Sequence, residues 1–157
     1  MLGKLLVHEG TSGIIIETEA YLGIGDLAAH SAAGITPRTR VIFGEPGHAY
    51  VYLNYGIHEC LNIVTEPEGI AGCVLLRALK PVDGIEFMRA RRKDAKDLTG
   101  GPGKLTQALG ITRVLNGADL TAGPLTVHDL KLKPRIRTTK RIGITKSPEL
   151  PLRFLAL

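Results

Sequence analysis

Tryptophan is absent from this sequence of 157 residues, and cysteine is nearly so. Cys60 and Cys73 are too few for a disulfide framework. No C-x-x-C or H-E-x-x-H motif offers the ligand spacing of a zinc site. The sequence therefore predicts no metal centre and favours a reducing compartment.

Long apolar runs are also missing. No segment approaches the roughly 20 apolar residues that span a bilayer, and the first residues lack the apolar region and cleavage site of a signal peptide. We therefore expect no membrane association and no secretion, with a location in the cytoplasm, near the nucleoid in a prokaryote, or in the nucleus of a eukaryote. The content of 44% hydrophobic residues is sufficient for one core, so residues 1–157 should form a single domain. A net charge of +5 favours polyanionic partners.

Residues 13–21 are β-branched and largely apolar, which predicts a strand. Alternation along this strand places Glu17, Glu19 and Tyr21 on one face. Because two carboxylates are costly to bury, this segment by itself favours a face exposed to solvent.

Residues 48–65 predict a β-hairpin around Asn54, Tyr55 and Gly56. Gly56 suits the left-handed position of a three-residue loop. Such a loop pairs even-numbered residues with one another, so one face of the hairpin should carry Tyr50, Tyr52, His58, Cys60 and Asn62. Tyr55 should lie at the exposed tip, where it either packs onto its own loop or acts as a wedge.

Residues 72–78 predict a buried strand that Pro81 should end. Arg77 interrupts this strand and therefore needs a partner, which is either a structural carboxylate or a functional anion.

Two further segments favour contact with phosphates. Residues 99–110 predict a glycine-rich turn that opens a short helix, where exposed amides and Lys104 suit a backbone phosphate. A block without acidic residues follows at 131–146 and suits a nucleic-acid backbone, although solvated surface charge explains it equally well; its basic residues are Lys131, Lys133, Arg135, Arg137, Lys140, Arg141 and Lys146.

All four tyrosines lie between residues 21 and 55, near Glu17, Glu19 and His30. Aromatic rings can stack an extruded base, and polar neighbours can read its edge and position a water molecule. The clustering therefore indicates a base-recognition pocket.

Six ordered blocks, spanning nearly the whole chain, resemble the alkyladenine (3-methyladenine) DNA glycosylase family. They are Glu17-Thr-Glu-Ala-Tyr21-Leu-Gly, Ala28-Ala-His30-Ser, Thr36-Pro-Arg38-x-Arg40, Tyr50-Val-Tyr52-x-x-Tyr55-Gly with Asn62, Val74-Leu-Leu-Arg77-Ala-Leu, and Gly101-Pro-Gly-Lys104-Leu-x-Gln-Ala-Leu-Gly. The resemblance implies a monomeric, cofactor-free base-excision-repair enzyme that acts on double-stranded DNA. Its substrates would be 3-methyladenine, 7-methylguanine, hypoxanthine and ethenoadenine. No lysine lies within the pocket motifs, so we expect hydrolysis without a lyase step.

The resemblance also implies residue roles. Glu19 would be the general base that activates water, and Arg77 would help to hold that water. Asn62 would exclude the exocyclic amino group of guanine, and Tyr55 would fill the space that the flipped nucleotide leaves. The base would stack among Tyr21, His30 and Tyr52, and further DNA contacts would come from Arg38, Arg40, Lys104, Ile57 and His58.

The expected architecture is one α+β domain. It has a curved antiparallel β-sheet, resembling an open barrel or roll, with short helices around it and a protruding hairpin that inserts into DNA. Family members usually carry a helical segment before the Leu2-Gly3-Lys4 block, and this sequence ends soon after Pro151-Leu-Arg-Phe154, with Leu152 where the family commonly has an aromatic residue. We therefore expect a domain shortened at both termini.

Two other interpretations remain open. Glu17 and Glu19, roughly 7 Å apart on one strand face, would suit the paired carboxylates of an inverting sugar hydrolase. The tyrosine hairpin and basic residues would also suit a nucleic-acid-binding domain without catalytic activity.

Overall fold

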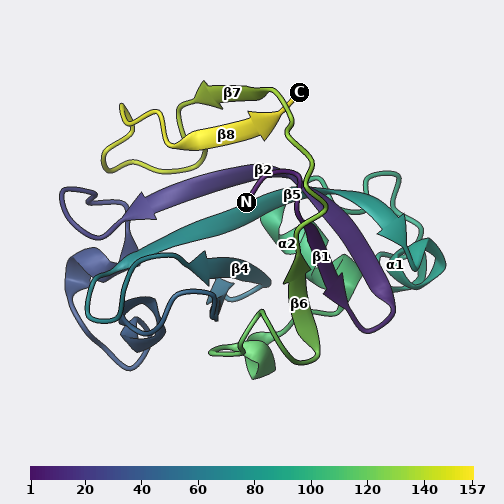
Figure 1. Cartoon of the computed structure of the whole chain (residues 1–157), viewed down its shortest axis with the longest axis horizontal. Coiled ribbons are helices and arrows are strands. Elements are labelled where there is room, and N and C mark those ends of the chain that lie inside the picture. Colours follow the sequence, from purple (N-terminus) through teal and green to yellow (C-terminus); the bar gives the residue numbers. More distant parts are fainter.

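An antiparallel sheet of eight strands forms the framework of the protein, as the computed structural model of residues 1–157 shows (Figure 1). Six strands follow the order β3-β4-β5-β2-β1-β6, while β8 pairs with both β2 and β7. The strands are β1 (Leu5–His8), β2 (Thr11–Leu22), β3 (Ala49–Asn54), β4 (His58–Val64), β5 (Gly72–Asp83), β6 (Leu125–His128), β7 (Ile136–Thr139) and β8 (Arg153–Ala156).

Two short α-helices, α1 (Ile85–Arg91) and α2 (Pro102–Leu109), pack beside the sheet. Proline suits the first position of α2, and Gly110 ends this helix in the left-handed conformation with φ 71°. Three 3₁₀ helices complete the structure: η1 (His30–Ala33), η2 (Arg40–Phe43) and η3 (Arg113–Leu115). The expected α+β domain with a curved antiparallel sheet is confirmed.

The two longest strands, β2 and β5, pair along their lengths and contain the predicted strands 13–21 and 72–78. The prediction that Pro81 ends its strand is wrong, because β5 continues to Asp83. Pro81 lies opposite Gly13, beside a shift in register between Ser12 and Gly13. A proline is tolerated at such an irregularity because the ladder there does not need its missing N–H group. Further register shifts around Glu17 interrupt the regular pairing of β2 with β5.

Strands β3 and β4 form the predicted hairpin. Tyr50 pairs with Asn62 and Tyr52 with Cys60, which confirms the expected pairing of even-numbered residues. In the turn, Tyr55 and Gly56 both have positive φ angles, 49° and 72°. Tyr55 is 85% exposed, so the hairpin presents an aromatic ring at its tip.

Two separate clusters of buried residues stabilise the sheet. The larger cluster joins the helices to the sheet and includes Leu6, Leu61, Met88, Leu105 and Leu125. The smaller cluster consists of Ile42, Tyr50, Val64, Ala71 and Cys73, and half-buried tyrosines pack against it. Aromatic side chains therefore concentrate at the smaller cluster.

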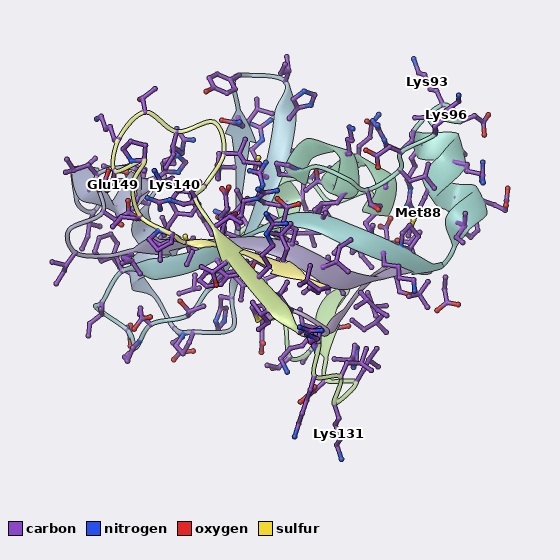
Figure 2. All side chains as sticks on the ribbon, turned by 90° about the horizontal axis from the view of Figure 1, so that it is seen from above. Met88, Lys93, Lys96, Lys131, Lys140 and Glu149 are labelled. Carbon is purple, nitrogen blue, oxygen red and sulfur yellow. The ribbon has the colours of Figure 1, made fainter.

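The basic residues of segment 131–146 do not form one surface. Figure 2 shows Lys131 at the end of a loop far from Lys140, while Lys93 and Lys96 lie beside α1. Arg141 is buried, so its assignment to a surface charge block is wrong. None of the helices is long and apolar enough to cross a membrane.

Candidate active site

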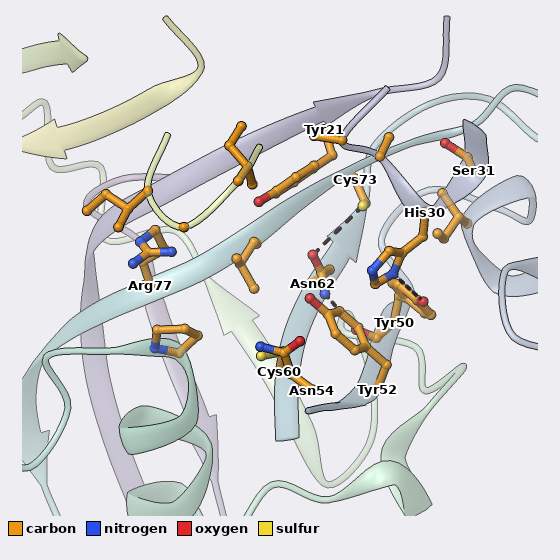
Figure 3. Close-up of a pocket in the computed structure, with 18 of the residues that line it drawn as sticks. Tyr21, His30, Ser31, Tyr50, Tyr52, Asn54, Cys60, Asn62, Cys73 and Arg77 are labelled. Atoms are coloured by element: carbon orange, nitrogen blue, oxygen red, sulfur yellow. Dashed lines mark hydrogen bonds between the residues drawn. The ribbon is translucent and has the colours of Figure 1, made fainter. Parts of the chain in front are cut away.

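A cavity of about 410 Å³ lies between the end of β2, the β3–β4 hairpin and the loop that follows β7 (Figure 3). Five aromatic side chains line it, those of Tyr21, His30, Tyr50, Tyr52 and Tyr55. The ring centroids of His30 and Tyr52 are 4.5 Å apart, and those of Tyr50 and Tyr52 are 5.3 Å apart. The three predicted stacking residues, Tyr21, His30 and Tyr52, thus lie in one pocket, although they come from three different elements.

Asn62 is held in a fixed orientation within this pocket. Its Nδ2 donates to the carbonyl oxygen of Tyr50 at 3.3 Å, and the thiol of Cys73 donates to its Oδ1 at 3.8 Å. Burial raises the pKa of the Cys73 thiol to about 12, so the sulfur retains its proton. Both ends of the Asn62 amide are therefore occupied by groups of the protein.

His30 is an uncharged ring at neutral pH. Burial, together with the positive charge of Arg38, lowers the pKa of its imidazole. Its Nδ1 lies 2.9 Å from the hydroxyl of Tyr50. Burial raises the pKa of that hydroxyl, which keeps its proton. The pair therefore contributes two neutral, fixed rings to the pocket.

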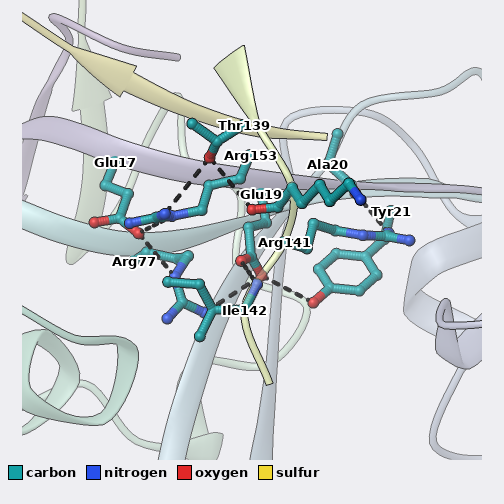
Figure 4. Close-up of polar contacts among 10 residues, drawn as sticks. Glu17, Glu19, Ala20, Tyr21, Arg77, Thr139, Arg141, Ile142 and Arg153 are labelled. Atoms are coloured by element: carbon teal, nitrogen blue, oxygen red, sulfur yellow. Dashed lines mark hydrogen bonds and ion pairs between the residues drawn. The ribbon is translucent and has the colours of Figure 1, made fainter. Parts of the chain in front are cut away.

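Glu19 has no exposed surface and does not line the cavity itself. Its polar contacts reach two residues that do, Tyr21 and Arg77 (Figure 4). Its Oε2 accepts hydrogen bonds from the hydroxyl of Tyr21 at 3.0 Å and from Nη1 of Arg77 at 3.3 Å. The backbone N–H of Ile142 donates to Oε1 at 2.8 Å. The expectation of a solvent-facing carboxylate is therefore wrong: three donors and the charge of Arg77 offset the loss of water around Glu19.

The hydroxyl of Tyr21 is a dependable donor to Glu19. Burial, and then the charge of Glu19, raise the pKa of this phenol far above its usual range. Tyr21 therefore joins the aromatic pocket to the carboxylate, since its ring lines the cavity and its hydroxyl reaches Glu19.

Glu17 occupies a different position from Glu19, although both side chains contact Arg77. Its Oε1 accepts hydrogen bonds from Nε of Arg77 at 3.0 Å and from Nε of Arg153 at 2.7 Å. Like Glu19, it does not line the cavity, but its side chain is 18% exposed and has no hydrogen bond to Tyr21. The partner that Arg77 needs within a strand is thus supplied by two carboxylates, those of Glu17 and Glu19.

Tyr55, the predicted wedge, contributes to the lining of the cavity, and the predicted DNA contact Ile57, two residues farther along the turn, is 71% exposed. His58 is exposed at the start of β4 and packs closely against the first turn of α2. A Cβ atom at Gly103 would lie 2.8 Å from the Cβ of His58, so glycine permits this approach.

Three predicted DNA contacts lie farther out. The guanidinium of Arg38 is 5.0 Å from the ring centroid of Tyr52, a cation–π contact at the edge of the pocket. Arg40 is exposed at the start of η2 and lines no part of the cavity. Lys104 forms an ion pair with Asp97, with Nζ and Oδ2 2.7 Å apart.

Several lining groups received no individual role from the sequence, although Tyr50 belongs to the tyrosine cluster that indicated the pocket. Tyr50 and Cys60 could have been found, because their side chains share the predicted hairpin face with Tyr52 and Asn62. The segment 142–144 could not, since it contributes a backbone N–H and aliphatic side chains without a chemical signature.

A buried carboxylate beside an aromatic pocket, with an exposed aromatic residue in its lining, suits extrusion of a base and cleavage of its bond to the sugar. These features are typical of a DNA glycosylase.

Comparison with known proteins supports the assignment to the DNA glycosylases. The model of the methylpurine-DNA glycosylase family matches residues 1–157, and the chain belongs to this family. A protein of Methanoculleus marisnigri is 54% identical over 98% of this chain and 85% of its own length. One from Rhodopseudomonas palustris is 53% identical over 98% of this chain and 77% of its own, and one from Prosthecochloris aestuarii is 50% identical over 96% and 76%. All three are provisionally named 3-methyladenine DNA glycosylases.

Proposed function

We propose that this protein flips damaged purines out of double-stranded DNA and hydrolyses their N-glycosidic bonds, leaving abasic sites. The substrates are 3-methyladenine, 7-methylguanine, hypoxanthine and ethenoadenine. The observation that carries this proposal is Glu19, a fully buried carboxylate that contacts two residues lining an aromatic pocket. Family membership and the names of the relatives support the same reaction.

Glu19 acts as the general base, and its contacts favour one oxygen for this role. A carboxylate oxygen accepts about two hydrogen bonds. Oε2 already accepts two, from Tyr21 and Arg77, whereas Oε1 accepts only the N–H of Ile142. Oε1 therefore retains the capacity to accept a proton from water. Its negative charge also stabilises the positive charge that develops on the sugar.

The aromatic rings suit damaged bases that carry a positive charge. Alkylation at N3 or N7 makes a purine cationic and a better leaving group, and each cation–π contact contributes about 0.5–2 kcal/mol. The neutral state of His30 matters here, because a protonated imidazole would repel such a base. Tyr21, His30 and Tyr52 thus favour the damaged base before any bond is broken.

Asn62 disfavours guanine through its exocyclic amino group; 7-methylguanine carries the same group but is cationic and a better leaving group, so it is released despite the poorer fit. Because the amide is bonded at both ends, it cannot turn away from an exocyclic amino group without losing these contacts. Normal purines greatly outnumber damaged ones, so rejection of guanine matters as much as recognition of the lesion.

Tyr55 opens the base stack. A large ring that is 85% exposed on a hairpin tip, with Ile57 beside it, can enter the space of an extruded nucleotide. Arg38, Arg40, Lys104 and His58 contact the neighbouring DNA in this proposal.

The reaction ends with hydrolysis and does not proceed to strand cleavage. A lyase step requires an amine that forms a Schiff base with the sugar, and no lysine lines the cavity. We therefore propose a monofunctional glycosylase.

The competing function is nucleic-acid binding without catalysis. To separate the two, duplexes that each contain one lesion are incubated with the protein and then treated with hot alkali, which cleaves abasic sites. The enzyme produces cleaved strands after alkali and none before it. Strands that stay intact at high protein concentration would favour the binding domain.

A further inference from the structure

The side chains of Asp26 and Arg141 form an ion pair without any solvent exposure. Nη1 of Arg141 lies 2.6 Å from Oδ2 of Asp26, and Nη2 lies 2.8 Å from Oδ1, so the contact is bidentate. In every other ion pair of the protein, at least one side chain retains solvent exposure. A buried ion pair is a weak source of stability, because the cost of removing both charges from water offsets most of the attraction. Its bidentate geometry, in contrast, fixes orientation strongly.

Asp26 organises one wall of the pocket. Besides binding Arg141, its carboxylate accepts hydrogen bonds from the backbone N–H groups of Leu22 and Ala28, both at 3.1 Å. These bonds fix the turn between the end of β2 and η1, which begins with His30. Burial raises the pKa of the Asp26 carboxyl, but the hydrogen bonds from Arg141 and the two N–H groups outweigh burial and lower it overall. Asp26 therefore stays charged at neutral pH.

Arg141 organises a second segment of the lining. Its Nη1 also donates to the carbonyl oxygen of Ala20 at 3.0 Å, and its guanidinium lies 4.7 Å from the ring centroid of Tyr21 (Figure 4). Its Nη2 reaches the carbonyl oxygen of Ser147 at 3.3 Å, which closes the loop 141–147 upon itself. Arg141 thus contacts both the backbone between Glu19 and Tyr21 and the aromatic face of Tyr21.

The next residue in the chain links this pair to the carboxylate. The N–H of Ile142 donates to Oε1 of Glu19, and Ile142, Gly143 and Ile144 line the cavity. Any displacement of Arg141 therefore moves this donor, together with a wall of the pocket.

We propose that Asp26 and Arg141 are positioning residues, which hold Glu19, Tyr21 and the loop 141–147 in the geometry that base release requires. This inference rests on the proposed glycosylase function. A misplacement of about 1 Å in an active site can lower a rate about 100-fold. The pair should therefore control the rate of base release more strongly than the binding of DNA.

The test compares Asp26→Asn and Arg141→Lys with the wild-type protein. Release of hypoxanthine from duplex DNA is measured in a single turnover with saturating protein, and affinity is measured on a duplex with an uncleavable tetrahydrofuran abasic site. We expect both variants to lower the saturated rate by about 100-fold, with affinity changed by less than about threefold. Saturation matters because partial unfolding of a variant then lowers the concentration of active protein but not the rate. If Asp26→Asn does not fold, Arg141→Lys, which keeps the charge, decides the outcome.

Two control variants separate positioning from stability. Asp129→Asn makes the same chemical change in the exposed ion pair with Lys4 and should retain the wild-type rate. Leu125→Ala weakens the larger hydrophobic cluster and should lower stability without lowering the saturated rate. The inference is overturned if both pair variants release base at the wild-type rate, if only their affinity falls, or if Leu125→Ala slows release equally. Absence of release by the wild-type protein would instead contradict the proposed function itself.

Discussion

The two buried clusters of this protein differ in what holds them together. The larger cluster contains fifteen buried apolar residues and packs both α-helices onto the sheet. The smaller cluster contains only five, and its surroundings are fixed by hydrogen bonds and ion pairs that involve Asp26, Arg77 and Arg141. Apolar burial is the main source of stability, whereas directional polar contacts fix side-chain positions. We infer that stability comes mainly from the first region and catalytic geometry from the second.

A substitution in the larger cluster should have the largest effect on stability. Leu6 is fully buried in β1, so Leu6→Ala removes apolar contacts and leaves a cavity. It should lower the free energy of unfolding by about 2–5 kcal/mol, measured by urea denaturation. The rate of base release at saturating protein should remain that of the wild type. A large drop in that rate would show that the two regions are coupled.

Tyr55→Ala tests the exposed part of the pocket region. Loss of the ring should lower base release from duplex DNA by about 10- to 100-fold, since stacking of an aromatic side chain on a base contributes about 1–3 kcal/mol. Release from a single strand should change much less, because no base stack has to be opened. Equal losses on both substrates would indicate that Tyr55 is a structural residue. Because the Tyr55 side chain is exposed, Tyr55→Ala should cause almost no loss of stability.

His30 should make stability depend on pH. Because the folded state lowers the pKa of His30, the unfolded chain binds the proton more readily. The free energy of unfolding should therefore decrease as pH falls below about 6.5, the unperturbed value for histidine. His30→Gln should show a smaller decrease over the same range in urea denaturation at several pH values. Identical pH dependence in the two proteins would contradict a lowered pKa for His30.

Lys104→Met should have the smallest effect. Lys104 is already paired with Asp97 on the surface, and such pairs contribute about 0–1 kcal/mol to stability. If Lys104 also contacts one phosphate, the slope of log affinity against log salt should decrease by about 0.9. Affinity should fall only a few-fold at moderate salt. An unchanged slope would exclude this phosphate contact.

Much of the fold could be predicted from local sequence patterns. The β-branched residues of β2 and the odd-length turn at Tyr55 predicted the strand and the hairpin pairing. The end of β5 was mispredicted at Pro81. The loss of one N–H group is tolerated beside an irregularity in the ladder, and only the pairing of the strands reveals this irregularity.

The site was less predictable from residue patterns. Alternation placed Glu19 on a polar face but could not show that Tyr21, Arg77 and a backbone N–H from residue 142 would surround it. Arg141 belonged to a basic block, and counting charges could not reveal that Asp26, 115 residues away, would bury it. Contacts between distant segments decide both cases, and family resemblance supplied the role of Glu19 that patterns alone did not.

The central claim is that one carboxylate of two performs the chemistry, and a matched pair of variants tests it directly. Glu19→Gln and Glu17→Gln remove the same charge from neighbouring positions that both contact Arg77. Single-turnover release of hypoxanthine from duplex DNA should be abolished in Glu19→Gln, with DNA affinity retained, while Glu17→Gln should keep substantial release. Equal and total loss in both variants would contradict the account and favour a mechanism with two carboxylates.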